Sequence, residues 1–166
     1  IDTMLDIYAP LKAAGVPFVI ANVESAEMIK YASNGFLATK ITFINEIADL
    51  CEAVGANVQD VSRGIGLDNR IGSKFLHAGP GYGGSCFPKD ALALIKTARD
   101  YDAPSKIVET VVAVNDARKA SMAERVIAAA GGSLKGKTVA VLGLTFKPNT
   151  DDMREAPSLA IVPALQ

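Results

Sequence analysis

Cysteine, histidine and long apolar runs are all scarce in this chain of 166 residues. It has two cysteines and one histidine. Two cysteines are too few for a disulfide framework and suit a reducing compartment, so we expect a cytoplasmic protein. The longest apolar stretches, such as 16–21 and 126–130, are far shorter than the roughly 20 residues that a membrane-spanning helix needs. The sequence therefore predicts no membrane partner.

An excess of charge of either sign is also lacking. The 17 basic and 18 acidic side chains give a formal net charge of −1. A general nucleic-acid binder would show a basic excess, so we expect no nucleic-acid partner. Apolar residues make up 49% of the chain and charged residues 21%, which is typical of a globular protein with a buried core.

Each flank of the sequence predicts only part of an α/β domain. Residues 3–14 predict a helix that ends at Gly15, and residues 16–20 predict a buried strand. Near the other end, the β-branched run 138–144 predicts a second buried strand, followed by a helix that Pro163 weakens. A single helix and strand cannot form a sheet, so we expect each flank to be a piece of a larger α/β domain.

The middle of the sequence predicts helices only. Residues 26–54 carry apolar side chains at helical spacing over about eight turns, and Gly55 ends this pattern. Asn57, followed by Asp60, predicts a capping box at the start of a short helix that ends near Gly66. The long helix is a candidate for a domain spine or a dimer interface.

Two further helices follow in the middle region. Pro88 suits the first position of a helix to about Tyr101, because that position needs no amide donor. Another long helix opens at Pro104 or Ser105 and runs to about residue 130. We therefore expect a mainly α central domain with a long spine helix, flanked by partial α/β Rossmann-like segments. The expected boundaries are 1–22, 23–134 and 135–166.

A glycine-rich loop precedes the second cysteine. The glycines within residues 79–84 satisfy the pattern G-x-G-x-x-G, which in dinucleotide-binding proteins follows a strand and opens a βαβ unit. Here the preceding residues 74–78 are not β-branched, and Pro80 occupies a variable position. We therefore prefer a loop that lets the backbone approach a ligand closely and carries Cys86 to a helix N-terminus.

Cys86 is predicted to be a reactive thiol. With Pro88 as the first helical residue, Phe87 is the cap and Cys86 stands just outside it. The free amides and the positive end of the helix dipole there favour a thiolate and lower a cysteine pKa. Lys89 adds positive charge, and Asp90 complements the dipole and could orient a water or transfer a proton.

Two structural alternatives stand beside these interpretations. A free cysteine is commonly a small buried apolar residue, a role that fits Cys51 on its helical stripe better than Cys86. Lys30 and Asn34 lie one turn apart on one helix face, where an ammonium and an amide can support an oxyanion or hold a water. A solvated helix face explains the same spacing.

Three motifs occur in one order and at matching spacing: AEMIKYASN at 26–34, GGSCFPKD at 83–90 and LGLTFKPNTDDMRE at 142–155. Over nearly the whole chain, the sequence resembles the UDP-glucose/GDP-mannose dehydrogenase family. The resemblance implies a helical dimerisation domain, similar to the C-terminal domain of 6-phosphogluconate dehydrogenase. In the family this domain joins an NAD-binding Rossmann domain to a domain that binds the nucleotide of the sugar.

The resemblance also implies a reaction. The C6 alcohol of UDP-glucose is oxidised to the carboxylate of UDP-glucuronate with NAD as the cofactor. Cys86 is the nucleophile that forms a thiohemiacetal and then a thioester, which water hydrolyses. Lys30 supports the oxyanion charge, Asn34 holds substrate and water, and Asp90 takes part in proton transfer.

Further site residues are implied by the same resemblance. Arg70 matches an arginine that reaches the neighbouring subunit's substrate site, which implies a homodimer built on the long helix. Lys89 and Arg154 match residues that contact NAD, and no metal is expected. The substrate-binding residues are Lys30, Asn34, Arg70, Phe75, Leu76, His77, Ala78, Gly79, Tyr82, Gly83, Phe87 and Lys147.

Several alternatives remain open at the level of sequence. The nucleotide fingerprint and the family's first-domain catalytic residues do not occur in these 166 residues, so we expect this chain alone to be inactive. GDP-mannose or another UDP-sugar is an alternative substrate. A non-catalytic helical dimerisation module is one alternative function. A cysteine acyl-transfer or hydrolytic enzyme is another, which would need His77 as its base.

Overall fold

The computed structural model describes residues 1–166 and contains seven helices and no β-strand. The chain divides into two units, 1–30 and 31–166, which are described separately. No helix combines the length and the apolar character that crossing a membrane requires. The mainly helical character agrees with the prediction for the middle of the sequence.

The first unit contains α1 (Asp2–Ile7), α2 (Ala9–Ala13) and the beginning of α3 (Val23–Val54). The prediction of one helix over 3–14 is wrong, because the helix breaks at Tyr8. Pro10 lies in the first turn of α2, where it lacks an amide proton and its ring would clash with the carbonyl four residues earlier in a continuous helix. Gly15 has a φ of 78°, which confirms its predicted role as a helix stop.

Neither predicted strand forms. Residues 16–20 and 138–144 have no sheet partner in the structure, and side chains such as Leu142 are exposed. Strands are stabilised by hydrogen bonds to a neighbouring strand, so a β-branched run without one stays irregular. The strand predictions are wrong for these 166 residues, and the Rossmann-like character of the flanks is not visible here.

Helix α3 confirms the predicted long helix and begins three residues earlier than expected. The side-chain oxygen of Asn22 accepts a hydrogen bond from the amide of Ser25 at 3.0 Å, which caps the first turn. At the other end, Gly55 adopts a φ of 75° and the amide of Ala56 donates to the carbonyl of Cys51 at 2.8 Å. This bond pattern is the usual glycine-dependent helix end.

Helix α4 (Val58–Gly66) has the predicted cap but not the predicted capping box. The side chain of Asn57 accepts a hydrogen bond from the amide of Gln59 at 2.9 Å. Asp60, expected to bond back to the cap, instead forms an ion pair with Arg63. The shorter aspartate side chain faces the next turn, where an arginine three residues on is its natural partner.

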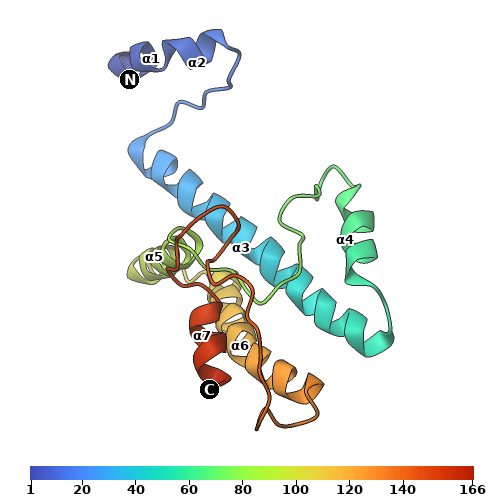
Figure 1. Ribbon diagram of the computed structural model, residues 1–166. Coiled ribbons are helices and arrows are strands. Elements are labelled where there is room, and N and C mark those ends of the chain that lie inside the picture. The colour runs from blue at the N-terminus through green and yellow to red at the C-terminus, as the bar shows by residue number, and fades with distance from the viewer. The chain divides into compact units, whose positions relative to one another are not determined.

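Helix α6 (Lys106–Ala129) packs against both α5 (Phe87–Asp100) and α7 (Ser158–Ala164). Ser105 stands at the N-cap of α6, and two glycines with positive φ follow its end at 131 and 132, as predicted. Pro163 lies inside α7, which has only seven residues. In Figure 1 the loop 67–86 connects α4 to α5 and passes beside α3.

The core contains two small apolar clusters that bring α3, α5, α6 and this loop together. One cluster joins Ala38 of α3 and Val111 of α6 to Tyr82 of the loop. The other joins Ala91 and Ile95 of α5 to Val108 of α6. Because Tyr82 is a core residue, the loop that leads to Cys86 is anchored close to the start of α5.

Candidate active site

Cys86 occupies the N-cap of α5, one residue further into the helix terminus than predicted. Its carbonyl accepts a hydrogen bond from the amide of Asp90 at 2.8 Å, which is the first bond of the helix. Phe87 is therefore the first helical residue and not the cap, and Pro88 is the second. Proline fits there as well, because the amides of the whole first turn lack helical partners.

Cys86 is exposed, whereas the other cysteine, Cys51, is buried. Ser85 places its hydroxyl 3.7 Å from the Cys86 sulfur. The pKa of Lys89 is raised, chiefly by its hydrogen bond to Asp90 and in part by Cys86. The exposure of the two thiols differs as the sequence interpretation requires, and the reactivity of Cys86 stays a prediction.

Arg154 supplies a second positive charge near the thiol. The pKa of its guanidinium is raised, chiefly by a hydrogen bond to Asp152 and to a smaller extent by Cys86. The same hydrogen bond lowers the pKa of Asp152 to about 2. Cys86 thus lies within the electrostatic reach of two cations, one on α5 and one on the segment 144–156.

The buried carboxylate of Asp90 is held by two predicted site residues. Asn34 donates from its side-chain nitrogen to one oxygen at 2.5 Å, and Lys89 forms an ion pair with the other oxygen. Asp90 is 2% exposed and Asn34 is 6% exposed. A buried carboxylate is costly unless it is paired and hydrogen-bonded, so these contacts fix its position at the start of α5. Lys30 belongs to the first unit, and its place beside this group stays a prediction.

The two glycines before Ser85 allow close contact with the segment 144–156. The amide of Gly84 donates to the carbonyl of Arg154 at 2.8 Å. A Cβ atom on Gly83 would lie 2.7 Å from the carbonyl carbon of Glu155, and one on Gly84 would lie 2.6 Å from the ring of Phe146. The sequence predicts that the backbone approaches a ligand at these glycines, and that role stays a prediction. The neighbour in the structure is protein rather than ligand.

A cleft of about 630 Å³ lies beside this junction. It is bounded by the glycine loop, by one side of α5 and α6, and by residues 154 and 155. Lys89 and Arg154, the two predicted NAD contacts, both line it. The cations of this cleft suit the pyrophosphate of a dinucleotide. The polar residues that line it include Ser85, Lys89, Asn115, Asp116, Lys119 and Arg154.

Most of the other predicted substrate residues are spread along the loop 70–79, and Lys147 lies in the segment 144–156. Phe75 adopts a φ of 64° and its ring lies 5.9 Å from that of Phe87. Leu76 is buried, and its carbonyl accepts from Ser62 at 2.6 Å. His77 is exposed. The remaining placements are a half-buried Ala78, an exposed Arg70 paired with Asp68 at 2.6 Å, and an exposed Lys147 whose ammonium lies 5.2 Å from the Phe146 ring centroid.

Comparison with known proteins decides the family. Residues 24–117 match the UDP-glucose/GDP-mannose dehydrogenase family, central domain, and residues 140–166 match the UDP binding domain of the same family. The chain belongs to the UDP-glucose/GDP-mannose dehydrogenase family. The resemblance that the three sequence motifs indicate is thereby confirmed.

Relatives in this family match almost the whole chain. A UDP-glucose 6-dehydrogenase of Rhizobium meliloti is 68% identical over 165 residues, which are 99% of this chain and 38% of that protein. The Bacillus subtilis UDP-glucose 6-dehydrogenase TuaD is 52% identical over 97% of this chain and 34% of its own length. A solved UDP-glucose dehydrogenase from Pyrobaculum islandicum has a TM-score of 0.89 and 41% identity, and covers 99% of this chain and 37% of its own. The chain thus spans little more than a third of these family members.

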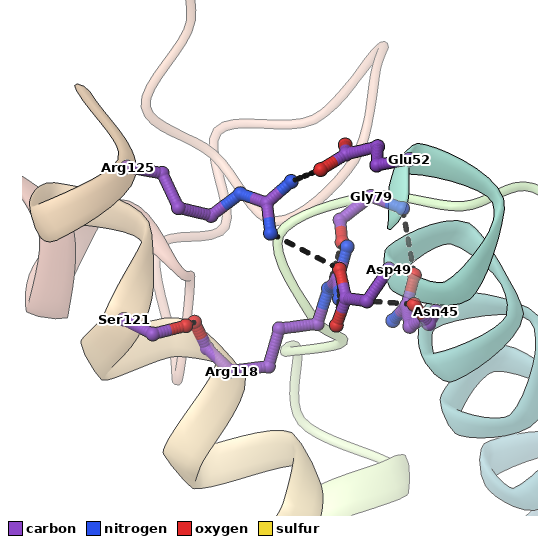
Figure 2. Close-up of polar contacts among 7 residues, drawn as sticks. All are labelled: Asn45, Asp49, Glu52, Gly79, Arg118, Ser121 and Arg125. Carbon is purple, nitrogen blue, oxygen red and sulfur yellow. Dashed lines mark hydrogen bonds and ion pairs between the residues drawn. The ribbon is translucent and has the colours of Figure 1, made fainter. Parts of the chain in front are cut away.

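Three residues that hold the loop of this family member escape the sequence analysis. Asn45, Asn115 and Arg118 bond to the backbone of the glycine loop from α3 and α6 (Figure 2 shows Asn45 and Arg118). The available signal is a polar residue at a buried position of an apolar helical stripe, as at Asn45 beside Ile44. The partner of such a residue lies far away in sequence, so the signal does not identify its role.

Proposed function

We propose that these residues carry the cysteine centre of an NAD-dependent UDP-glucose 6-dehydrogenase. The observation that carries the proposal is the exposed Cys86 at the N-terminus of α5, close enough to Lys89 and Arg154 to influence both cations. An exposed cysteine at a helix N-terminus near cationic side chains is a common setting for nucleophilic catalysis. The names of the relatives support UDP-glucose as the substrate.

The proposed reaction has two oxidations. NAD+, when bound, accepts one hydride in each of them, and the cations of Lys89 and Arg154 fit its pyrophosphate. The first oxidation converts the C6 alcohol to an aldehyde. The Cys86 thiolate then adds to the aldehyde carbon, which gives a thiohemiacetal. Loss of the second hydride leaves a thioester, and water cleaves it to release the carboxylate and the thiol.

Asn34 and Asp90 are proposed to act together on water and protons. Asn34 fixes the carboxylate of Asp90 one turn into α5 from Cys86. From there Asp90 can accept the proton of the alcohol or of the attacking water. Lys30, one turn before Asn34 on α3, is proposed to stabilise the negative oxygen that develops at C6.

We also propose that these 166 residues are the middle of a longer protein, called the full-length enzyme below. Its proposed parts are 1–22 from an NAD-binding domain, 23–134 as the central domain and 135–166 from a UDP-binding domain. The small share of each relative that the chain covers supports a longer protein, and the family matches at 24–117 and 140–166 support the last two parts. The segment alone is expected to be inactive, and the cytoplasmic location stays a prediction.

A homodimer through α3 is proposed for the full-length enzyme. Phe36, Phe43 and Leu50 recur every seventh residue and are all exposed, so one face of α3 carries an uncovered apolar stripe. Arg70 is also exposed and is proposed to reach the substrate site of the partner. A long helix with such a stripe is a common dimer interface.

The test is NADH formation by the full-length enzyme with a panel of nucleotide sugars: UDP-glucose, GDP-mannose and N-acetylated UDP-sugars. We expect UDP-glucose to be the preferred substrate and two NADH to form per sugar. Cys86→Ser should abolish formation of the carboxylate, whereas Cys51→Ala, at the buried cysteine, should retain it. A Cys86→Ser variant with undiminished activity would overturn the cysteine mechanism, and a preference for GDP-mannose would overturn the substrate.

A further inference from the structure

The glycine loop that leads to Cys86 is held in place by side chains. Residues 79–85 lie between α4 and α5 and belong to neither helix. Backbone polar groups of such a loop need partners when they are buried. Here the partners at two separate points, Gly79 and Tyr82, are amide and guanidinium groups from α3 and α6.

The first point is Gly79, whose amide and carbonyl are both engaged (Figure 2). Its amide donates to the side-chain oxygen of Asn45 at 2.8 Å. Its carbonyl accepts from Nε of Arg118 at 2.5 Å. Arg118 also donates to the main-chain carbonyl of Asn45 at 3.0 Å, so one guanidinium ties the loop to α3.

Arg118 is itself oriented by carboxylates. Asp49 accepts from Arg118 at 2.9 Å, and Arg125 donates to the same carboxylate at 3.1 Å and pairs with Glu52 (Figure 2). The Arg118 side chain is only 11% exposed. A buried guanidinium with a paired carboxylate and two carbonyl acceptors has one preferred geometry.

The second point is Tyr82. Its amide donates to the side-chain oxygen of Asn115 at 2.8 Å, and its carbonyl accepts from the Asn115 nitrogen at 3.2 Å. Asn115 is 3% exposed, so its amide is fixed by these contacts and by its position on α6. The Tyr82 ring meets that of Phe87 edge-on, with the ring centroids 5.9 Å apart. A movement of Tyr82 would therefore disturb Phe87, the residue that directly follows Cys86.

From these contacts we infer that Asn45, Arg118 and Asn115 are positioning residues for Cys86. They fix the loop at Gly79 and Tyr82, and only residues 83–85 separate the second point from the sulfur. Glycines occupy two of those three positions, and apart from the bond between Gly84 and Arg154 the contacts of the three positioning side chains, called the clamps below, are what limit the conformations of the loop. Correct placement of a nucleophile matters steeply for rate, since a displacement of about 1 Å can cost roughly a hundredfold. The inference rests on the proposed function of Cys86.

The experiment compares two clamp variants in the full-length enzyme. Arg118→Met removes the bond to the Gly79 carbonyl. Asn115→Asp keeps the acceptor for the Tyr82 amide but sets an oxygen against the Tyr82 carbonyl. We expect kcat to fall by about tenfold to a hundredfold in each variant while KM for UDP-glucose changes much less. The matched control is Arg63→Met, which removes an exposed arginine that also pairs with an aspartate but lies on α4.

Alkylation of Cys86 by iodoacetamide gives a readout that does not depend on turnover. Release of the loop changes the surroundings of the exposed sulfur, so we expect the alkylation rate to change several-fold in the two clamp variants and to stay the same in Arg63→Met. Asn45→Asp, which keeps an acceptor for the Gly79 amide, should retain more activity than Asn45→Leu. Thermal unfolding identifies any variant that fails to fold. In that case the other clamp variant tests the positioning role.

Unchanged kcat and unchanged alkylation in a folded clamp variant would overturn the inference. Equal losses in Asn45→Asp and Asn45→Leu would also count against it, because the acceptor would then be irrelevant. If the unaltered full-length enzyme forms no NADH, the proposed function fails. The alkylation rates then decide the positioning role by themselves.

Discussion

The amide of Gly84 donates a hydrogen bond to the carbonyl oxygen of Arg154 with a nitrogen–oxygen distance of 2.8 Å. This bond joins the loop before Cys86 to the segment 144–156, more than sixty residues later in the chain. The contact is possible because residue 83 has no Cβ atom to meet the backbone of Glu155. The position of Arg154 near the thiol therefore depends on glycine at 83.

Gly83→Ala tests this dependence. The new Cβ would meet the backbone of residues 155 and 156, which cannot move aside as a flexible side chain can. We expect the free energy of unfolding of the full-length enzyme to fall by about 1–3 kcal/mol, and activity to fall as the two segments separate. Differential scanning calorimetry and an NADH assay measure the two effects.

The matched control for Gly83→Ala is Gly64→Ala, on α4. No heavy atom lies within 4 Å of a Cβ placed there, and its φ is also not positive. Alanine is a better helix former than glycine, so this variant should be as stable as the unaltered protein or slightly more stable. Equal effects of the two substitutions would contradict the close approach.

Asp90→Ala is predicted to destabilise the site as well as to inactivate it. The substitution leaves the buried Asn34 amide without its carboxylate acceptor, which costs about 1–3 kcal/mol in the free energy of unfolding. Asp100→Ala is the control. Asp100 lies on the same helix and pairs with Lys96 at 2.5 Å, but both side chains are largely exposed, so at most about 1 kcal/mol is expected. Chemical denaturation of both variants checks the difference, and a loss at Asp90 no larger than at Asp100 contradicts it.

Tyr82 predicts a pH dependence in the alkaline range. Burial, and secondarily the charge of Asp116, raise the pKa of its phenol from 10.0 to about 12. The neutral phenol is thus favoured in the folded state, and its contribution to the free energy of unfolding is complete below pH 10. That contribution, on the order of 2 to 3 kcal/mol, is lost as the pH rises from about 10 through about 12.

Rapid pH jumps followed by tyrosinate absorbance measure this titration before the protein unfolds. The difference between the unaltered protein and Tyr82→Phe should show one phenol that ionises near pH 12. Tyr101→Phe removes an exposed tyrosine and should leave the ionisation near pH 12 in place. Asp116→Asn should move this ionisation to lower pH. A Tyr82→Phe variant that still shows a phenol ionising near pH 12 would refute the assignment.

Helix ends were predictable here because their signals are local. Gly15, Gly55 and Asn57 act through their own backbone or the next two residues, so sequence alone places the ends of α2 and α3 and the start of α4. The strand at 138–144 failed for the opposite reason. A strand needs a partner elsewhere in the chain, and no local pattern supplies one.

The candidate site likewise has features that local sequence predicts and features that it does not. The proposed role of Cys86 was inferred from a glycine loop and a proline within four residues of it. The contact between Asn34 and Asp90 joins residues 56 apart and needs the packed helices to form. Arg118 was missed because its partners, Gly79 and Asn45, are 39 and 73 residues away. The residue types of a site can be predicted locally, whereas its supporting contacts come from tertiary packing.

The apolar stripe of α3 carries a last prediction, on assembly. Phe36, Phe43 and Leu50 are 65%, 50% and 57% exposed, and a spacing of seven residues keeps them close to one face of the helix. Burial of each such side chain against a second copy contributes about 1.5–3 kcal/mol. Phe43→Glu puts a charge in the middle of the stripe and should convert the full-length enzyme from dimer to monomer. Ile107→Glu, at an exposed apolar residue of α6, should leave the dimer intact. Analytical ultracentrifugation separates the two states, and a Phe43→Glu variant with the sedimentation coefficient of the dimer rules out this face as the interface.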